Sequence, residues 1–372
     1  MSPDPFADIL RPTLLLDEAR ARANIARMAR KAHAQGIRFR PHFKTHQSIE
    51  IGEAFRAEGV RQITVSSLDM AEYFAAAGWD DLTIAFPANL RQMAGLAALA
   101  RRLHLGLLVE SPESAAALGK GLQAPADVWL KVDVGSHRTG LAWDRPEAAR
   151  AVIAALEGFL HLRLAGLLTH AGHTYTAASP QAVRQIYAET LGRLGELRSR
   201  LGLDSLELSV GDTPGCSLVE DFGPAQEIRP GNFVFYDAEQ YLLGSCPWEQ
   251  VAVAVACPLV ALHPERQEAV VYGGAIHLSK DFMPYAGQTA YGLVALPRED
   301  GRGWGEPIPG AFVRGLSQEH GLLHLPADAF AGLHVGDLLC VIPAHSCLTV
   351  TALGEYRTLE GRKILTMNRE PA

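Results

Sequence analysis

Short apolar runs alternate with longer amphipathic segments between about residue 37 and residue 235. Apolar runs of about four to eight residues are typical of buried strands, and a period near 3.6 is typical of helices. Ser67 before LDMAEYF and Ser111–Pro112 before ESAAAL are typical helix starts. The pattern predicts strands at 37–41, 62–66, 82–86, 104–109, 128–132, 162–169, 206–210 and 233–236, and helices at 67–77, 90–102, 112–119, 145–158 and 181–201.

Eight strands separated by helices predict the α/β class and a closed (β/α)8 barrel of the TIM type. An open, doubly wound sheet is the alternative, but no GxGxxG follows the first strand, so the usual nucleotide signature of that fold is missing. In a barrel, functional side chains lie just after the strands, on the C-terminal rim. We therefore expect the chemistry of this chain at the strand ends.

The pattern changes at about Cys246. The stretches QVAVAVACPLVAL, EAVVYGGAI, GLLHL and DLLCVIPAH predict strands with Gly and Pro turns and little helix. TLLLD, at 13–17, precedes the barrel pattern and predicts one more strand of this β-rich part. The predicted organisation is a barrel over 18–240 and a smaller, mostly antiparallel β domain made of 1–17 and 241–372.

Composition narrows the class of protein. The net charge of −7 argues against a nucleic-acid partner. No apolar run of about eighteen residues is present, so no membrane span is expected. The stretch MSPDPFADILRP has no apolar core of a signal peptide, and five scattered cysteines without a CxxC pair predict free thiols in a reducing cytoplasm.

Polar and titratable residues follow several predicted strands. After the first strand, RPHFKTH places Lys44 between His42 and His46 at alternate positions, and an extended backbone would point all three to one face. A buried ammonium is costly unless it is paired or neutralised, so Lys44 either lies in a solvated basic loop or has a chemical role. The later strand ends carry VDVGSHRTG, THAGHTY, GDTPGCS and RPGNFVFYD.

The stretch GDTPGCS, 211–217, has free N–H groups and hydroxyls without bulk, as a phosphate site requires. Barrels of this class commonly bind phosphate after strands seven and eight. The alternative is a plain Gly/Pro turn. A phosphate site together with Lys44 indicates pyridoxal 5'-phosphate, which needs a lysine for its aldehyde and a cradle for its phosphate.

These stretches also carry a resemblance. RPTLLLD, RPHFKTH, VDVGSHRTG, THAGHTY, GDTPGCS, RPGNFVFYD, SQEHG and IPAHSCLTV occur in this order between Arg11 and Val350. With them the chain resembles the fold-type III pyridoxal-phosphate enzymes, the alanine-racemase-like barrels. Within these it is most similar to the D-serine dehydratase and D-threonine aldolase branch.

The resemblance implies that Lys44 is the lysine that forms the Schiff base with the cofactor. It also implies a set of residues that line the cofactor and the substrate. They are Arg138, His170 and Arg229 around the ring, Gly211, Thr213, Gly231 and Asn232 at the phosphate, and His173, Tyr175 and His320 on the substrate side.

His345 and Cys347 form the pair HSC in the predicted β domain. At positions i and i+2 of a strand the imidazole and the sulfur would point the same way and could share one ion. Two ligands of this kind prefer zinc and leave positions open to water or substrate. The alternative is a buried His and Cys without an ion. In the resembled branch the motif holds a catalytic divalent metal, so we expect Zn²⁺, with Mn²⁺ or Mg²⁺ as alternatives, although Leu348 stands where that branch often has proline.

The resemblance implies a metal-assisted lyase for β-hydroxy D-amino acids, above all one that dehydrates D-serine to pyruvate and ammonia. Lys44 would remove the Cα proton, and the metal would act as a Lewis acid on the β-oxygen. Aldol cleavage of D-threonine or D-3-hydroxyaspartate is the first alternative, and a racemase or a non-catalytic cofactor carrier is the next. A metal hydrolase built on His170, His173 and His345 would leave Lys44 unexplained. The expected partners are a small D-amino acid and a second copy of the chain in a homodimer.

Overall fold

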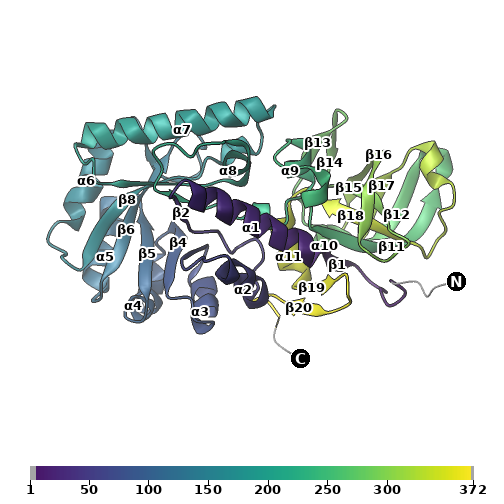
Figure 1. The fold of residues 1–372 in the computed structure, drawn as a ribbon, viewed down its shortest axis with the longest axis horizontal. Helices are drawn as coiled ribbons and strands as arrows, with labels where there is room; N and C mark the ends of the chain where they lie inside the picture. Colours follow the sequence, from purple (N-terminus) through teal and green to yellow (C-terminus); the bar gives the residue numbers. More distant parts are fainter. Residues whose placement is uncertain (1–5, 370–372) are drawn as a thin grey trace. The chain divides into compact units, whose positions relative to one another are not determined.

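The computed structural model describes residues 6–369, which form two compact units (Figure 1). The barrel unit holds Ala26–Lys44 and Gly52–Gly231. The β unit holds the chain up to Ile25, Thr45–Ile51 and the chain from Asn232 onward. Within the described residues, no helix has the length and apolar character needed to cross a membrane.

The barrel unit is built on eight parallel strands in the order β2-β10-β9-β8-β6-β5-β4-β3. A parallel bridge between His42 and Thr64 links the segment after β2 to β3, so the two ends of this order also pair. This arrangement confirms the predicted TIM-type barrel. The strands are β2 (Arg38–Phe39), β3 (Ile63–Val65), β4 (Asp81–Pro87), β5 (His104–Val109), β6 (Ala126–Asp133), β8 (Leu162–Leu168), β9 (Glu207–Val210) and β10 (Glu227–Ile228), with the short β7 (Leu141–Ala142) beside β6.

The predicted strand at 233–236 was wrong. The eighth barrel strand is β10, and Asn232–Val234 instead forms the 3₁₀ turn η3, with the Tyr236 N–H donating to Asn232 O at 2.8 Å. Pro230 cannot donate to a strand ladder, so the sheet ends just before it. The run FVF is fully buried in either conformation, and its apolar character therefore did not distinguish a strand from a turn.

Most barrel helices begin at the residues that the sequence indicated. The Ser67 hydroxyl accepts from Met70 N at the start of α3, and Ser111 forms a capping box with Ser114 at the start of α5. The helices and turns of this part of the chain are α1 (Glu18–Ala34), α2 (Ile49–Ala57), α3 (Leu68–Ala76), η1 (Leu90–Gln92), α4 (Met93–Ala100), α5 (Pro112–Gly121), α6 (Pro146–Leu156), η2 (Gly172–Thr174), α7 (Pro180–Leu201) and α8 (Thr213–Leu218).

Charged residues link the starts of the barrel strands. Glu227 at the start of β10 is fully buried and accepts hydrogen bonds from Arg38 Nε and Arg40 Nε, each at 2.7 Å. Farther round the sheet, His104 Nε2 lies 2.9 Å from Asp127 Oδ2. These groups lie at the end of the barrel opposite the C-terminal rim, where they act on stability.

The β unit is a nine-stranded, mostly antiparallel sheet in the order β12-β17-β16-β15-β18-β11-β1-β19-β20. The predicted strand at 13–17 is confirmed as β1, which pairs antiparallel with β11 and parallel with β19. Its strands are β1 (Thr13–Leu16), β11 (Val253–His263), β12 (Glu268–Tyr272), β15 (Gly292–Pro297), β16 (Trp304–Leu316), β17 (His320–His324), β18 (Leu338–Pro343), β19 (Glu355–Thr358) and β20 (Lys363–Leu365). A separate antiparallel pair is formed by β13 (Met283–Tyr285) and β14 (Gln288–Ala290).

The β unit also holds three short helices that matter for the site. They are α9 (Ala238–Leu242), α10 (Ala275–Leu278) and α11 (Ser346–Leu353). Its remaining 3₁₀ turns are η4 (Trp248–Gln250), η5 (Pro264–Arg266) and η6 (Ala327–Phe330).

Candidate functional site

Lys44 follows β2 on a turn, and it is half-buried. The turn is fixed by its backbone: His42 N–H donates to Pro230 O and Phe43 N–H donates to Thr64 O, both at 2.9 Å. The Phe43 ring is fully buried and lies 4.9 Å from the ring of Phe74, centroid to centroid. The lysine is thus carried on an anchored rim segment rather than on a loose basic loop.

The expectation that His42, Lys44 and His46 share one face of a strand was wrong, because the chain turns between Phe43 and His46. His46 is fully buried in the β unit, where its carbonyl accepts from Tyr356 Oη at 2.8 Å. Burial lowers the pKa of His46 to about 3, so this imidazole is neutral. His46 therefore has a structural role.

His42 belongs with Lys44 in the barrel unit. Its Nδ1 accepts the backbone N–H of Lys44 at 3.3 Å. Burial, together with the charges of Lys44 and Arg229, holds the pKa of His42 well below its usual range. The sequence pattern singled out this histidine only as part of the RPHFKTH motif.

His170 follows β8, and Arg138 lies in the loop after β6. His170 Nδ1 lies 2.7 Å from Gly211 O, a pure acceptor, so Nδ1 carries the proton. Burial and the charges of Lys44 and Arg138 hold the pKa of His170 well below its usual range. Arg138 itself is exposed. The structure thus places these two candidates within electrostatic reach of Lys44.

Arg229 follows β10 and is 4% exposed. Its Nε donates to Ser209 Oγ at 2.7 Å, and its Nη2 donates to Thr169 O. Burial lowers the pKa of Arg229 to about 10. Within residues 6–369 the Nη1 group has no hydrogen-bond acceptor, so one face of a rigidly held guanidinium remains available to a ligand.

Lys131 is a titratable neighbour that the sequence prediction missed. It lies on β6, is 6% exposed, and its Nζ donates to Val132 O at 3.3 Å. Burial and the charges of Arg229 and Arg138 lower its pKa to about 8. A lysine inside the otherwise apolar run VWLKV was the available signal.

The GDTPGCS loop is less open than its composition predicts. Asp212 caps α8: its Oδ1 accepts from Gly215 N at 2.6 Å and from the Thr174 hydroxyl at 2.8 Å. Thr213 N lies 3.4 Å from Tyr175 Oη. Gly211 permits close packing, since a Cβ there would lie 2.7 Å from the Arg229 backbone. These contacts already engage the amides of Thr213 and Gly215.

The loop after β10 has more open backbone amides than the GDTPGCS loop. The backbone N–H groups of Gly231 and Asn232 have no acceptor in the part of the chain that the structure describes. Unpaired amides after barrel strands fit an anion such as a phosphate. The Nδ2 group of Asn232 is engaged elsewhere, because it donates to Asp237 Oδ2 at 2.6 Å and to Ser346 Oγ at 2.9 Å.

The three candidates for the substrate side lie in two units: His173 and Tyr175 in the barrel unit and His320 in the β unit. His173 on η2 has a buried Nδ1 without a partner in the described residues, and burial lowers its pKa. The Tyr175 ring lies 6.1 Å from that of His170, centroid to centroid. His320 is exposed at the start of β17 in the β unit.

His345 and Cys347 lie at the start of α11, not on a strand as expected. β18 ends at Pro343, and His345 is the N-cap residue of α11. A helix can begin here because Ser346 N donates to the buried carboxylate of Asp237 at 3.0 Å. Cys347 is 8% exposed, and its Sγ lies 3.3 Å from Thr45 Oγ1.

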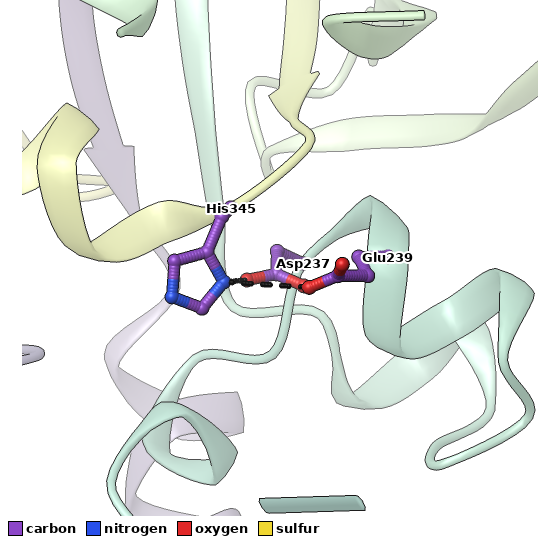
Figure 2. A group of neighbouring side chains, drawn as sticks. All are labelled: Asp237, Glu239 and His345. Atoms are coloured by element: carbon purple, nitrogen blue, oxygen red, sulfur yellow. Dashed lines mark ion pairs between the residues drawn. The ribbon is translucent and has the colours of Figure 1, made fainter. Parts of the chain in front are cut away.

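Two carboxylates approach His345, and the sequence prediction missed both (Figure 2). His345 Nδ1 lies 3.1 Å from Asp237 Oδ2 and 3.7 Å from Glu239 Oε2. Burial alone would lower the pKa of His345, but Cys347 and Asp237 hold it well above its usual range. Burial and the charge of Asp237 raise the pKa of Glu239 to about 8. Imidazole, thiol and carboxylate together form a donor set that fits a borderline divalent cation.

The barrel unit fits pyridoxal phosphate by its own chemistry. It supplies an anchored lysine and a neutral histidine, and within residues 6–369 the Arg229 Nη1 group and the Gly231 amide have no acceptor. These are the groups that an aldehyde, an aromatic ring and a phosphate require.

Comparisons with known proteins agree with this chemistry. Residues 16–239 match the family model of the alanine racemase N-terminal domain, and residues 252–359 match that of a serine dehydratase domain. The chain is 32% identical to D-threo-3-hydroxyaspartate dehydratase of Delftia sp. (strain HT23), over 94% of this chain and 93% of that protein. It is 28% identical to D-serine dehydratase of Dictyostelium discoideum, over 96% and 95%.

Solved structures show the same likeness. The structure of the Delftia dehydratase matches with a TM-score of 0.85 and 29% identity, and the match covers 98% of each chain. By sequence, the chain is also 28% identical to D-threonine aldolase of Arthrobacter sp., over 92% of this chain and 87% of that protein. The chain therefore belongs to the fold-type III pyridoxal-phosphate enzymes, in the branch that joins an alanine-racemase-like barrel to a serine dehydratase domain.

Proposed function

We propose that this protein is a metal-assisted, pyridoxal-phosphate-dependent lyase that converts D-serine to pyruvate and ammonia. The observation that carries the proposal is the HSC pair at the start of α11, with His345 held at 3.1 Å from a buried carboxylate. The chain that bears this pair is 28% identical over 96% of its length to a D-serine dehydratase. Family membership makes the cofactor pyridoxal phosphate.

Pyridoxal phosphate, when bound, supplies an electron sink for the pair left at Cα as its proton departs. Lys44 Nζ is the group proposed to take that proton. His42 and His170 are neutral, so neither competes as a charged acid beside the lysine. Arg229 Nη1 and Arg138 would hold the ring, and the Gly231 and Asn232 amides would hold the phosphate. Gly211 and Thr213 remain proposed parts of the cradle, and His173, Tyr175 and His320 remain proposed substrate contacts.

His345 and Cys347 are proposed to hold a divalent ion, which supplies Lewis acidity for the departing β-hydroxyl. A thiol ligand favours Zn²⁺ over Mn²⁺ or Mg²⁺. A cysteine-to-alanine mutant of D-threo-3-hydroxyaspartate dehydratase was solved in the metal-free form, and that structure matches this chain with a TM-score of 0.86. That relative therefore supports a metal role for the cysteine.

A second substrate is favoured by one observation. The 32% identity to D-threo-3-hydroxyaspartate dehydratase points to a substrate with a second carboxylate, whose dehydration and hydrolysis would give oxaloacetate and ammonia. Aldol cleavage of D-threonine or D-3-hydroxyaspartate, with glycine as a product, is the remaining alternative in this branch.

The test is product analysis on the purified protein loaded with pyridoxal phosphate and Zn²⁺. We expect pyruvate from D-serine, none from L-serine, and a loss of at least about 100-fold in Lys44→Ala, because a positioned base contributes that much or more. Removal of the ion with a chelator should abolish pyruvate formation, and Zn²⁺ should restore it. Oxaloacetate from D-threo-3-hydroxyaspartate at a higher kcat/KM would make that acid the substrate. Glycine from D-threonine, or L-serine from D-serine, without pyruvate would overturn the proposal.

We also propose that the protein is a cytoplasmic homodimer. All five cysteines are buried, and none forms a disulfide within residues 6–369, which suits a reducing compartment. Sedimentation of the holoenzyme at twice the mass of the 40.1 kDa chain would support the dimer, and sedimentation as a monomer would contradict it.

A further inference from the structure

Glu227 is a fully buried glutamate whose two carboxylate oxygens have different partners. Oε2 accepts from Arg38 Nε and from Arg40 Nε, each at 2.7 Å. Oε1 accepts from the Ser209 hydroxyl at 2.6 Å. Burial alone would raise the pKa of Glu227, but the charges of Arg40 and Arg38 hold it below its ordinary value, so the carboxylate is ionised. The two arginines thus fix the orientation of this charged group, with Oε1 toward Ser209.

Ser209 links Glu227 to Arg229. It lies beside Glu227 in the register of β9 and β10. Arg229 follows Glu227 by two residues, and its backbone N–H donates to Val210 O at 2.8 Å, so the extended chain directs the Glu227 and Arg229 side chains to one face. Arg229 Nε donates to Ser209 Oγ at 2.7 Å. A chain of hydrogen bonds between three buried side chains therefore runs from Arg229 through Ser209 to Glu227.

The direction of each hydrogen bond in this chain is determined by its donors and acceptors. A guanidinium only donates, and an ionised carboxylate only accepts. The Ser209 hydroxyl therefore accepts from Arg229 Nε and donates its own proton to Glu227 Oε1. Because neither end can reverse its role, the hydroxyl has one orientation, and it holds Arg229 Nε in one place.

The other contacts of Arg229 leave one edge of its guanidinium for a ligand. Nη2 donates to Thr169 O, and Nη1 has no acceptor within residues 6–369. A guanidinium is planar, so anchoring Nε and Nη2 also sets the direction of Nη1. Without the Ser209 hydroxyl, Nη2 alone would be anchored by a side-chain-independent contact, and the plane could rotate.

We propose that Ser209 and Glu227 are positioning residues of the cofactor site. Glu227 fixes the Ser209 hydroxyl, and this hydroxyl fixes the Arg229 guanidinium so that Nη1 faces the cofactor ring. The inference rests on the proposed function, which puts Arg229 at that ring. It gives Glu227, a carboxylate at the start of a barrel strand, a part in the chemistry of the opposite rim in addition to its part in stability.

The test is the binding of pyridoxal phosphate to the full chain, followed by the visible band of the bound cofactor. Ser209→Ala removes the hydroxyl and keeps the contacts of Glu227 with Arg38 and Arg40. We expect its Kd for pyridoxal phosphate to rise about tenfold, the order of effect of one hydrogen bond to a charged group. The absorption maximum should also shift, because a displaced guanidinium changes the charge beside the ring. Ser209→Thr keeps a hydroxyl and should retain the wild-type Kd and spectrum.

Glu227→Gln is a second variant, and Glu207→Gln is its matched control. An amide has one acceptor oxygen, which Arg38 and Arg40 already need, so Glu227→Gln should reproduce both changes and also lower the thermal midpoint. Glu207 accepts from Arg38 Nη1 at 3.4 Å and forms no hydrogen bond with Ser209 within residues 6–369. Its substitution should change the Kd less than about twofold, as expected of a partly exposed ion pair.

Two results would overturn the inference. One is a lower thermal midpoint in Ser209→Ala with unchanged Kd and spectrum, because Ser209 would then act on stability alone. The other is an equal rise of the Kd in Glu207→Gln, which would make the effect a general one of charge at this end of the barrel. Arg229→Ala tests the premise: if its Kd and spectrum match those of the wild type, the placement of Arg229 in the proposed function is wrong instead.

Discussion

Lys131 is a buried ammonium whose neighbours are themselves cationic. It is 6% exposed on β6, and its pKa of about 8 lies below the ordinary value of 10.5 because of burial and the charges of Arg229 and Arg138. A base with a lowered pKa in the folded state destabilises the protein wherever it stays protonated. The loss in the free energy of unfolding is complete below about pH 8 and disappears as the pH rises toward 10.5.

We therefore expect Lys131→Met to raise the thermal midpoint at pH 7. The gain in the free energy of unfolding has an upper limit of about 3 kcal/mol, from the size of the pKa shift. The advantage should shrink between pH 8 and pH 10.5, which calorimetry of both proteins over this range would show. Lys120→Met, at an exposed lysine, is the control and should change little. An equal gain at pH 7 and at pH 10.5 would contradict the electrostatic cause.

At the scale of single residues, the sequence indicated those whose chemistry shows in a short motif. Lys44, His345 and Cys347 stand in such motifs, and the structure places them on a turn and at a helix start. Asp237 and Glu239 could not be found in this way, because they approach His345 only in the folded chain, and the segment before them was predicted as a strand.

At the scale of elements, α8 shows how a buried cap can set a local pKa. Asp212 accepts from Gly215 N at 2.6 Å and from the Thr174 hydroxyl. Burial nevertheless raises the pKa of this carboxyl to about 6. An acid whose pKa is raised in the folded state costs stability that appears as the pH rises above the ordinary value near 3.8 and is complete above about pH 6.

Two substitutions separate the cap from the charge. Asp212→Ala should lower the free energy of unfolding by about 1–2 kcal/mol, because the Gly215 amide loses its acceptor. Asp212→Asn keeps an acceptor and removes the charge, so at pH 8 it should be at least as stable as the wild type. Its advantage should shrink below pH 6. Thermal midpoints at pH 5 and pH 8 would test this, and an Asn variant as unstable as the Ala variant at pH 8 would contradict it.

Elements with a local signal were predictable, and elements defined by their partners were not. Ser111 marked the start of α5, and the apolar run of β5 matched its strand at His104–Val109. β10 is only two residues long and contains Glu227, which is buried because Arg38 and Arg40 neutralise it. A two-residue strand that contains a glutamate does not resemble a core strand in sequence. The eighth strand was therefore predicted at the apolar FVF that follows.

At the scale of the whole molecule, the two-part architecture was predictable because the change from alternating helices to consecutive strands is visible over hundreds of residues. The contacts between charged groups at the strand starts were not predictable, because these residues are far apart in the chain. His104 lies between Asp81 and Asp127, whose hydrogen bonds raise its pKa to about 9. A raised pKa in a base contributes stability that is complete below the ordinary value near 6.5 and is lost as the pH rises through 9.

His104→Gln should therefore lower the thermal midpoint most at about pH 6 and hardly at all above pH 9. The side chain is 48% exposed, so solvent screening limits the effect to less than about 1 kcal/mol, and added salt should reduce it. Calorimetry at low and high ionic strength measures both dependences. His334→Gln, at a histidine with 80% exposure, is the control. If the thermal midpoint of His104→Gln stayed below that of the wild type above pH 9, lost packing rather than lost charge interactions would be the cause.

The discontinuous make-up of the β unit has a consequence for how the chain is made. β1 is synthesised before the barrel strands, yet Leu15 pairs with Arg357 in β19, which follows those strands in the chain. The barrel strands between Arg38 and Ile228 are complete before either neighbour of β1, β11 or β19, exists. An apolar strand must therefore wait, unpaired, while the whole barrel is translated, when such edges attract other chains. A premature stop codon between the codons of β11 and β19 would leave β1 without its parallel neighbour.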